Sequence, residues 1–97
     1  MIGYVTHHYS GSHELFEHIK EIVAEIQEDD WDNCYVCPVL AFPYICGCDD
    51  DVKNVMSVRL DLLSVCDQLI VVGKTIDTFM QAEIDFARLV GMEIFYV

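Results

Sequence analysis

The feature that most constrains the fold of this chain is the alternation of short apolar runs with longer segments of helical periodicity. Mostly apolar runs of strand length occur at Ile2–Thr6, Gln68–Gly73 and Glu93–Val97, and a further strand is expected at about Cys34–Leu40. Alternation of strands and helices is typical of a parallel sheet that is covered on both faces. We therefore expect an α/β fold: a small open parallel sheet of about four strands with helices on both faces, a three-layer sandwich of the flavodoxin-like or Rossmann-like kind.

Three segments between these strands have the spacing of helices. Apolar residues recur at helical intervals over Leu15–Ile26, with glutamates on the other side. A second helix is expected at about Val52–Cys66, apolar on most of its surface, and a third at Ile76–Gly91. Ala41–Asp51 contains a proline and a glycine that break regular structure, so it is expected to form a loop.

Composition limits the partners that a chain of this kind can have. Its 97 residues suffice for one small domain, residues 1–97, and the hydrophobic fraction of 54% is high enough to suggest apolar surface hidden in a homo-oligomer. Five Lys and Arg against 17 Asp and Glu give a net charge of −12, which argues against nucleic acid as a partner. Neither a signal peptide nor a membrane-spanning run is recognisable, so we expect a soluble, cytoplasmic protein without a membrane partner.

The cysteines allow two interpretations. Their number is odd, and they are Cys34, Cys37, Cys46, Cys48 and Cys66. The first four superficially resemble a zinc set, but residues three apart in a strand point to opposite faces, which opposes a shared metal. We favour reduced structural thiols and expect no metal, with zinc as the alternative.

Glu83 is a carboxylate on the apolar side of the third expected helix. The apolar residues of that helix are Ile76, Phe79, Met80, Phe86, Ala87 and Val90. Glu83 lies near the middle of their arc, where a charge is costly unless it is paired, protonated or at a cleft. Two alternatives follow: a carboxylate satisfied by a hidden arginine or by backbone donors, or a functional carboxylate.

In open parallel sheets, ligands bind beyond the carboxyl ends of the strands, near the switch in strand order. The candidate ligand-binding residues near two such ends are His7, His8, Tyr9, Gly11 and Lys74. Lys74 and the start of the following helix could hold one phosphate through helix-end amides.

Common cofactor motifs are missing from the chain. It contains neither G-x-G-x-x-G nor a Walker pattern, and no H-E-x-x-H metal site, so no cofactor is expected. Two carboxylates, Glu83 and Asp61, with tyrosines near one pocket leave glycosidic-bond chemistry as the natural enzymatic candidate. Asp61 could equally be an exposed residue of its helix.

Four pieces of the sequence together resemble the nucleoside 2-deoxyribosyltransferase-like superfamily, especially its small phage and bacterial branch. These pieces are Tyr4–Tyr9, Cys37–Phe42, Leu60–Asp67 and Ala82–Ala87. The resemblance implies a nucleoside- or nucleotide-derived substrate, a homo-oligomer whose subunits complete each other's sites, and the host cytoplasm as location if a phage encodes the chain.

The resemblance also implies roles for three residues. Glu83 corresponds to the glutamate that attacks the anomeric carbon of the sugar, Asp61 to the acid/base that serves the nucleobase, and Tyr4 to the tyrosine that orients the glutamate. Asp67 corresponds to a structural aspartate before the central strand.

The chain departs from the family pattern in two ways. Phe79 stands where a small residue is usual, and its ring would narrow the pocket or stack on a base; the sequence also ends at Val97, without the usual C-terminal extension. We therefore keep three hypotheses: cleavage or transfer of an N-glycosidic bond through Glu83, non-catalytic binding of a nucleotide-derived molecule or immune signal, and an acidic protein-interaction module.

Overall fold

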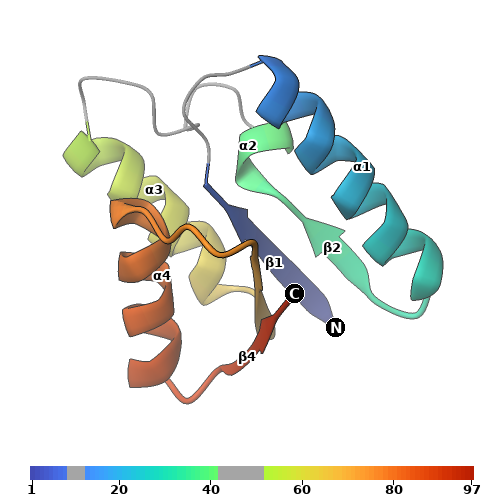
Figure 1. Cartoon of the computed structure of the whole chain (residues 1–97). Coiled ribbons are helices and arrows are strands. Elements are labelled where there is room, and N and C mark those ends of the chain that lie inside the picture. Colours follow the sequence, from blue (N-terminus) through green and yellow to red (C-terminus); the bar gives the residue numbers. More distant parts are fainter. Residues whose placement is uncertain (9–12, 42–51) are drawn as a thin grey trace.

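A computed structural model describes residues 1–8, 13–41 and 52–97 of the chain (Figure 1). The strands are β1 (Ile2–His7), β2 (Cys34–Val36), β3 (Gln68–Val72) and β4 (Glu93–Tyr96). The helices are α1 (His13–Asp29), α2 (Pro38–Ala41), α3 (Val52–Ser64) and α4 (Thr78–Leu89). The α/β alternation expected from the periodicity is confirmed.

The strands form one parallel sheet in the order β2-β1-β3-β4. The chain therefore moves outward from β1 to β2 and then returns to add β3 and β4 on the other side of β1. This reversal lies between β1 and β3, where the register pairs His7 with Val72. The carboxyl ends of these two strands flank the switch point at which open α/β sheets bind ligands.

Helices cover the sheet on both faces, so the molecule has three layers (Figure 1). Strand alternation divides the apolar side chains into two cores. Tyr4, Leu69 and Val71 pack with α3 and α4, whereas Val5 and Ile70 pack with α1. Together the two cores confirm the expected three-layer sandwich.

One expected strand is shorter than the sequence suggested. The strand expected over Cys34–Leu40 ends at Val36, and Pro38 begins the short helix α2. Proline has no N–H to give to a strand ladder, and its fixed φ suits the first turn of a helix. Except for Ala41, the segment expected to be a loop lies outside the described residues.

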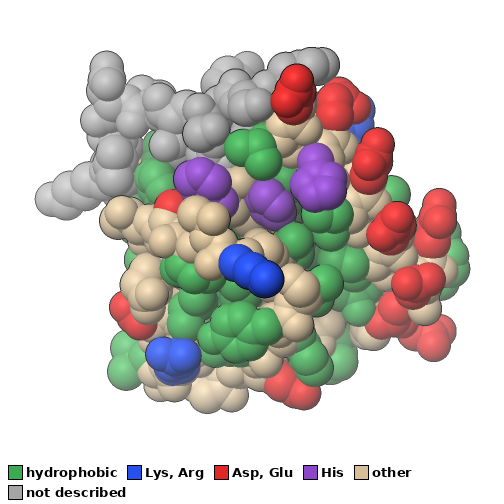
Figure 2. All heavy atoms as spheres, in the orientation of Figure 1, with side chains coloured by type: hydrophobic (Ala, Val, Ile, Leu, Met, Phe, Trp, Pro, Cys, Tyr) green, Lys and Arg blue, Asp and Glu red, His purple; other side chains and the backbone are tan. Residues whose placement is uncertain are grey.

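Acidic side chains are concentrated on the outer side of α1 (Figure 2). Five glutamates face away from the sheet there, and the last turn of the helix carries no basic residue. Within the described ranges, no helix is both long and apolar enough to cross a bilayer.

Candidate functional site

A row of polar side chains runs along one face of β1. Tyr4 and Thr6 point to the α3/α4 side because alternate residues of a strand share a face. His8, two residues beyond Thr6, continues the row just after the strand ends. The row thus leads from the core to the carboxyl edge of the sheet.

The buried end of this row surrounds the Glu83 carboxylate. The side chain is 0% exposed and lies on the inner face of α4. Thr6 Oγ1 donates to Oε1 at 2.7 Å, and Tyr4 Oη donates to Oε2. Two hydroxyls of one strand therefore hold both oxygens of the carboxylate.

Arg59 of α3 completes the cluster. Its Nη2 lies 2.9 Å from Glu83 Oε1 and its Nε lies 3.2 Å from Oε2, so the ion pair is bidentate. Arg59 is 2% exposed, and the Phe79 ring lies 4.9 Å from its guanidinium carbon. Across residues 1–8, 13–41 and 52–97, every buried side-chain nitrogen and oxygen has a hydrogen-bond partner.

These contacts determine the protonation of the cluster. Burial, followed by the charge of Glu83, raises the pKa of Tyr4, so the hydroxyl remains a donor. Burial acts to lower the pKa of Arg59, but Glu83 and Tyr4 outweigh it and raise the pKa overall. The cluster therefore consists of a neutral tyrosine, a charged guanidinium and the carboxylate that it pairs with.

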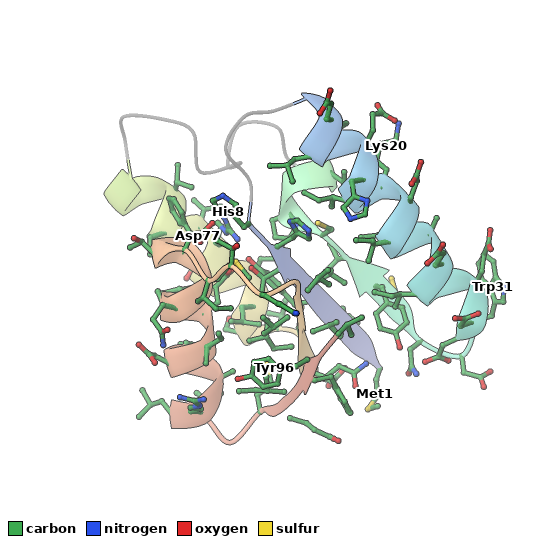
Figure 3. All side chains as sticks on the ribbon, viewed as in Figure 1. Met1, His8, Lys20, Trp31, Asp77 and Tyr96 are labelled. Carbon is green, nitrogen blue, oxygen red and sulfur yellow. The ribbon has the colours of Figure 1, made fainter. Side chains whose placement is uncertain are left out.

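The exposed end of the row is a histidine–aspartate pair. His8 Nδ1 lies 3.2 Å from Asp77 Oδ2, and the two labelled side chains point toward each other in Figure 3. Asp77 also caps α4, since its Oδ1 accepts from the Met80 N–H at 2.9 Å. An open hollow of about 480 Å³ lies over this start of α4, and Asp77, Thr78, Gln81 and Asp85 supply its polar lining.

The structure separates several of the residues that the sequence suggested for one site. Tyr4 meets Glu83, as expected from the resemblance. Asp61 is exposed and lies two residues from Arg59, so the two side chains leave α3 on opposite sides. Asp61 is therefore not placed to act together with Glu83.

The suggested ligand-binding residues are also distributed over different places. His7 lies on the α1 face of the sheet, where its ring meets the edge of His18 with centroids 6.3 Å apart. The Phe79 ring stacks on Arg59 inside the protein, whereas Lys74 is exposed after β3. Tyr9 and Gly11 lie outside the described residues.

Arg59 is the residue that the sequence interpretation did not identify, although a hidden arginine was one of its two alternatives. A signal for it exists in the sequence. Arg59 lies four residues after Val55 and four before Leu63, and both of these are buried. A basic residue on the apolar face of one helix and an acidic residue on the apolar face of the next suggest an ion pair between them.

Other polar groups have structural contacts. Asp67 Oδ2 accepts from the Ile2 N–H at 2.7 Å and so joins the beginnings of β1 and β3. Cys34 is exposed, whereas Cys37 and Cys66 are buried. The part of the chain that the structure describes contains no group of three metal-ligating side chains, and Cys46 and Cys48 fall outside it.

Comparison with known proteins gives one match. A family model described as a domain of unknown function, DUF7768, matches residues 2–97. No curated protein and no solved structure matches the chain. Because the family model covers nearly the whole sequence, the chain belongs to the DUF7768 domain family.

Proposed function

We propose that the protein binds a nucleoside- or nucleotide-derived small molecule beyond the carboxyl ends of β1 and β3, without cleaving it. The polar row from Glu83 to the His8–Asp77 pair is the observation that carries this proposal. It ends at the switch point of the sheet, where α/β domains of this topology bind ligands. The sequence resemblance to nucleoside 2-deoxyribosyltransferases supports the ligand class.

The polar groups at this edge favour an uncharged, hydroxyl-rich ligand. Asp77 lies at this edge and lines the hollow at the start of α4, and carboxylates accept hydrogen bonds from sugar hydroxyls. The same carboxylate repels phosphate groups. Register places Lys74 just beyond the end of β3, beside the end of β1, so Lys74 is a cationic partner for one phosphate there.

Binding is favoured over catalysis by the state of Glu83. Both of its oxygens accept hydrogen bonds, a guanidinium neutralises its charge, and it has no exposed surface. A nucleophilic carboxylate needs a free lone pair within reach of the anomeric carbon. Here the carboxylate instead holds Tyr4 and Thr6 of β1, the strand that His8 directly follows.

Calorimetric titration with nucleosides and their 5′-monophosphates tests this proposal. We expect a nucleoside to bind and to be recovered unmodified, as measured by mass spectrometry. His8→Gln and Asp77→Asn should each weaken nucleoside binding by about fivefold, because each removes one polar contact with the ligand. Asn still caps a helix, so Asp77→Asn removes charge without unfolding α4.

Glu25→Gln is the matched control, because Glu25 is an exposed carboxylate on α1. It should bind the nucleoside as the wild type does. Unchanged affinity in both site variants would contradict the proposed location.

A second candidate is cleavage of the N-glycosidic bond, and the hydrogen bond from Tyr4 to Glu83 favours it. In that reaction a Glu83 oxygen bonds to the sugar C1′ as the bond from C1′ to the base nitrogen breaks, and the base takes a proton from water as it leaves. A further water molecule then hydrolyses the glycosyl ester and restores the carboxylate. Arg59 would have to move away from the carboxylate first. Release of free base over several turnovers, lost in Glu83→Gln, would establish this function in place of simple binding.

The proposal includes a homo-oligomer. Leu89 is 84% exposed and Val65 is 67% exposed, and exposed apolar side chains are common at subunit contacts. Sedimentation equilibrium should therefore give a mass above 11.1 kDa. A monomer at all accessible concentrations would contradict this part of the proposal.

A further inference from the structure

A second pocket lies on the opposite face of the sheet from Glu83. Its volume is about 340 Å³, within the range of small-molecule sites. Ile70 and Phe95, paired in register on neighbouring strands, form its apolar floor, and Val97 extends it. Phe95 is 42% exposed, so its ring is available to a ligand.

The other end of the pocket is polar and is built around Asp30. Its Oδ2 accepts from Tyr35 Oη at 2.6 Å and from Asn33 Nδ2 at 2.6 Å. These two hydrogen bonds, that of Tyr35 first, lower the pKa of Asp30. The buried Gln68 side chain lies on the same wall. An ionised carboxylate is thus held in place at the edge of an apolar floor.

The electrostatic field at this position is negative. Asp30 immediately follows the carboxyl end of α1, where helix dipoles leave partial negative charge, and the last turn has no basic residue to offset it. No lysine or arginine is among the residues that line the pocket. The net charge of −12 adds to the attraction of cations from solution.

We propose that this pocket binds a small organic cation with an apolar body, with its ammonium group at Asp30 and its body against Ile70 and Phe95. An anion would be repelled by the Asp30 carboxylate, whose pKa the Met1 ammonium also helps to lower. A neutral apolar molecule would make the apolar contacts with Ile70 and Phe95 but would form no ion pair with Asp30. An aromatic amine combines both contacts.

Phenethylammonium and its neutral analogue 2-phenylethanol separate these contributions. In ¹H–¹⁵N spectra, the side-chain amide signals of Asn33 and Gln68 should shift on titration with the ammonium compound. The alcohol should bind at least about fivefold more weakly than the ammonium compound, because it lacks the ion pair with Asp30.

Asp30→Asn should remove this preference, since the amide oxygen can still accept from Tyr35 but carries no charge. Asp32→Asn is the control, because Asp32 is an exposed carboxylate of the same turn that does not line the pocket. Phe95→Ala should weaken the binding of both compounds. His8→Gln should leave it unchanged, so failure of the proposed nucleoside site and failure of this pocket are distinguishable.

Equal affinities of the wild type for the amine and the alcohol would overturn the proposal. So would unchanged amine affinity in Asp30→Asn, or the absence of shifts at Asn33 and Gln68.

Discussion

At the residue scale, the ion pair between Arg59 and Glu83 allows the core to hold two charged side chains. Each charge alone would cost several kcal/mol to bury, and the bidentate geometry together with two hydroxyl donors offsets that cost. The pair spans α3 and α4, and the hydroxyls come from β1. A single carboxylate therefore joins three elements of the fold.

Removing one member of the pair should be far more damaging than removing both. We expect Arg59→Met and Glu83→Gln each to lower the free energy of unfolding by about 3–5 kcal/mol, because each leaves a buried charge without its ionic partner. The double variant should lose less than either single variant, because it leaves no buried charge unpaired. Urea denaturation of the four proteins measures this coupling.

Lys20→Met provides the comparison for these variants of the buried pair. Lys20 pairs with Glu17 at 3.6 Å on the exposed side of α1, where an ion pair contributes at most about 1 kcal/mol. Single variants of Arg59 and Glu83 that were as mild as Lys20→Met would show that the buried pair has no special role.

The sequence was sufficient to identify Glu83 as unusual but not to decide between its two alternatives. Helical periodicity places a residue on a face, and it contains no information on which side chain of another helix lies opposite. Arg59 is 24 residues away, and only the packing of α3 against α4 brings the two together. For the same reason, it stayed open whether Asp61 belongs to a site with Glu83 or is an exposed residue of its helix until its side of α3 was known.

At the element scale, the beginning of α4 combines a structural and a surface role. Asp77 caps the helix with one carboxylate oxygen and meets His8 with the other. The helix therefore starts where the polar row of β1 ends. This arrangement fixes the distance between the buried carboxylate and the exposed pair.

The two roles of Asp77 can be separated by substitution. Asp77→Ala should lower the free energy of unfolding by about 1 kcal/mol through loss of the cap, whereas Asp77→Asn should stay close to the wild type. Urea denaturation monitored by circular dichroism measures both. Equal losses in the two variants would indicate that the charge, rather than the cap, stabilises α4.

The element boundaries show where local signals were incomplete. The strand expected to reach Leu40 ends early, because Pro38 suits a helical first turn and cannot donate to β1. The helix expected over Ile76–Gly91 was placed correctly, and its cap trims it to Thr78–Leu89. Apolar periodicity locates elements, whereas proline and capping residues set their ends.

At the scale of the whole molecule, the two faces of the sheet differ in chemistry. The α3/α4 face holds a closed, fully paired charge cluster, and the α1 face leaves an open pocket beside the carboxyl end of α1, whose last turn has no basic residue. The buried thiol of Cys66 makes the stability of the protein depend on pH. Burial, and then the charge of Asp67, raises the pKa of Cys66 to about 11.

This shift predicts that stability falls at alkaline pH. Below pH 9 the Cys66 thiol is protonated in both states, and between pH 9 and 11 it ionises only in the unfolded chain. The unfolded state then binds fewer protons, so the free energy of unfolding decreases as pH rises. The raised pKa of Tyr4 acts in the same direction from about pH 10 upward, where tyrosine ionises in the unfolded chain.

Thermal unfolding under reducing conditions at pH 8, 9 and 10.5 measures this effect. The Tm should decline over the series, and the decline should be smaller in Cys66→Ala. A Tm that stays level, or that declines equally in the variant, would contradict the assignment.

Local patterns were enough to establish the number and order of the main strands and helices, the parallel sheet and the position of Glu83 on an apolar face, since these depend on periodicity within short segments. Long-range packing alone placed Arg59 against Glu83, turned Asp61 to solvent and left the Asp30 pocket open on the other face. These outcomes depend on which surfaces of distant segments meet, and a one-dimensional pattern does not contain that information.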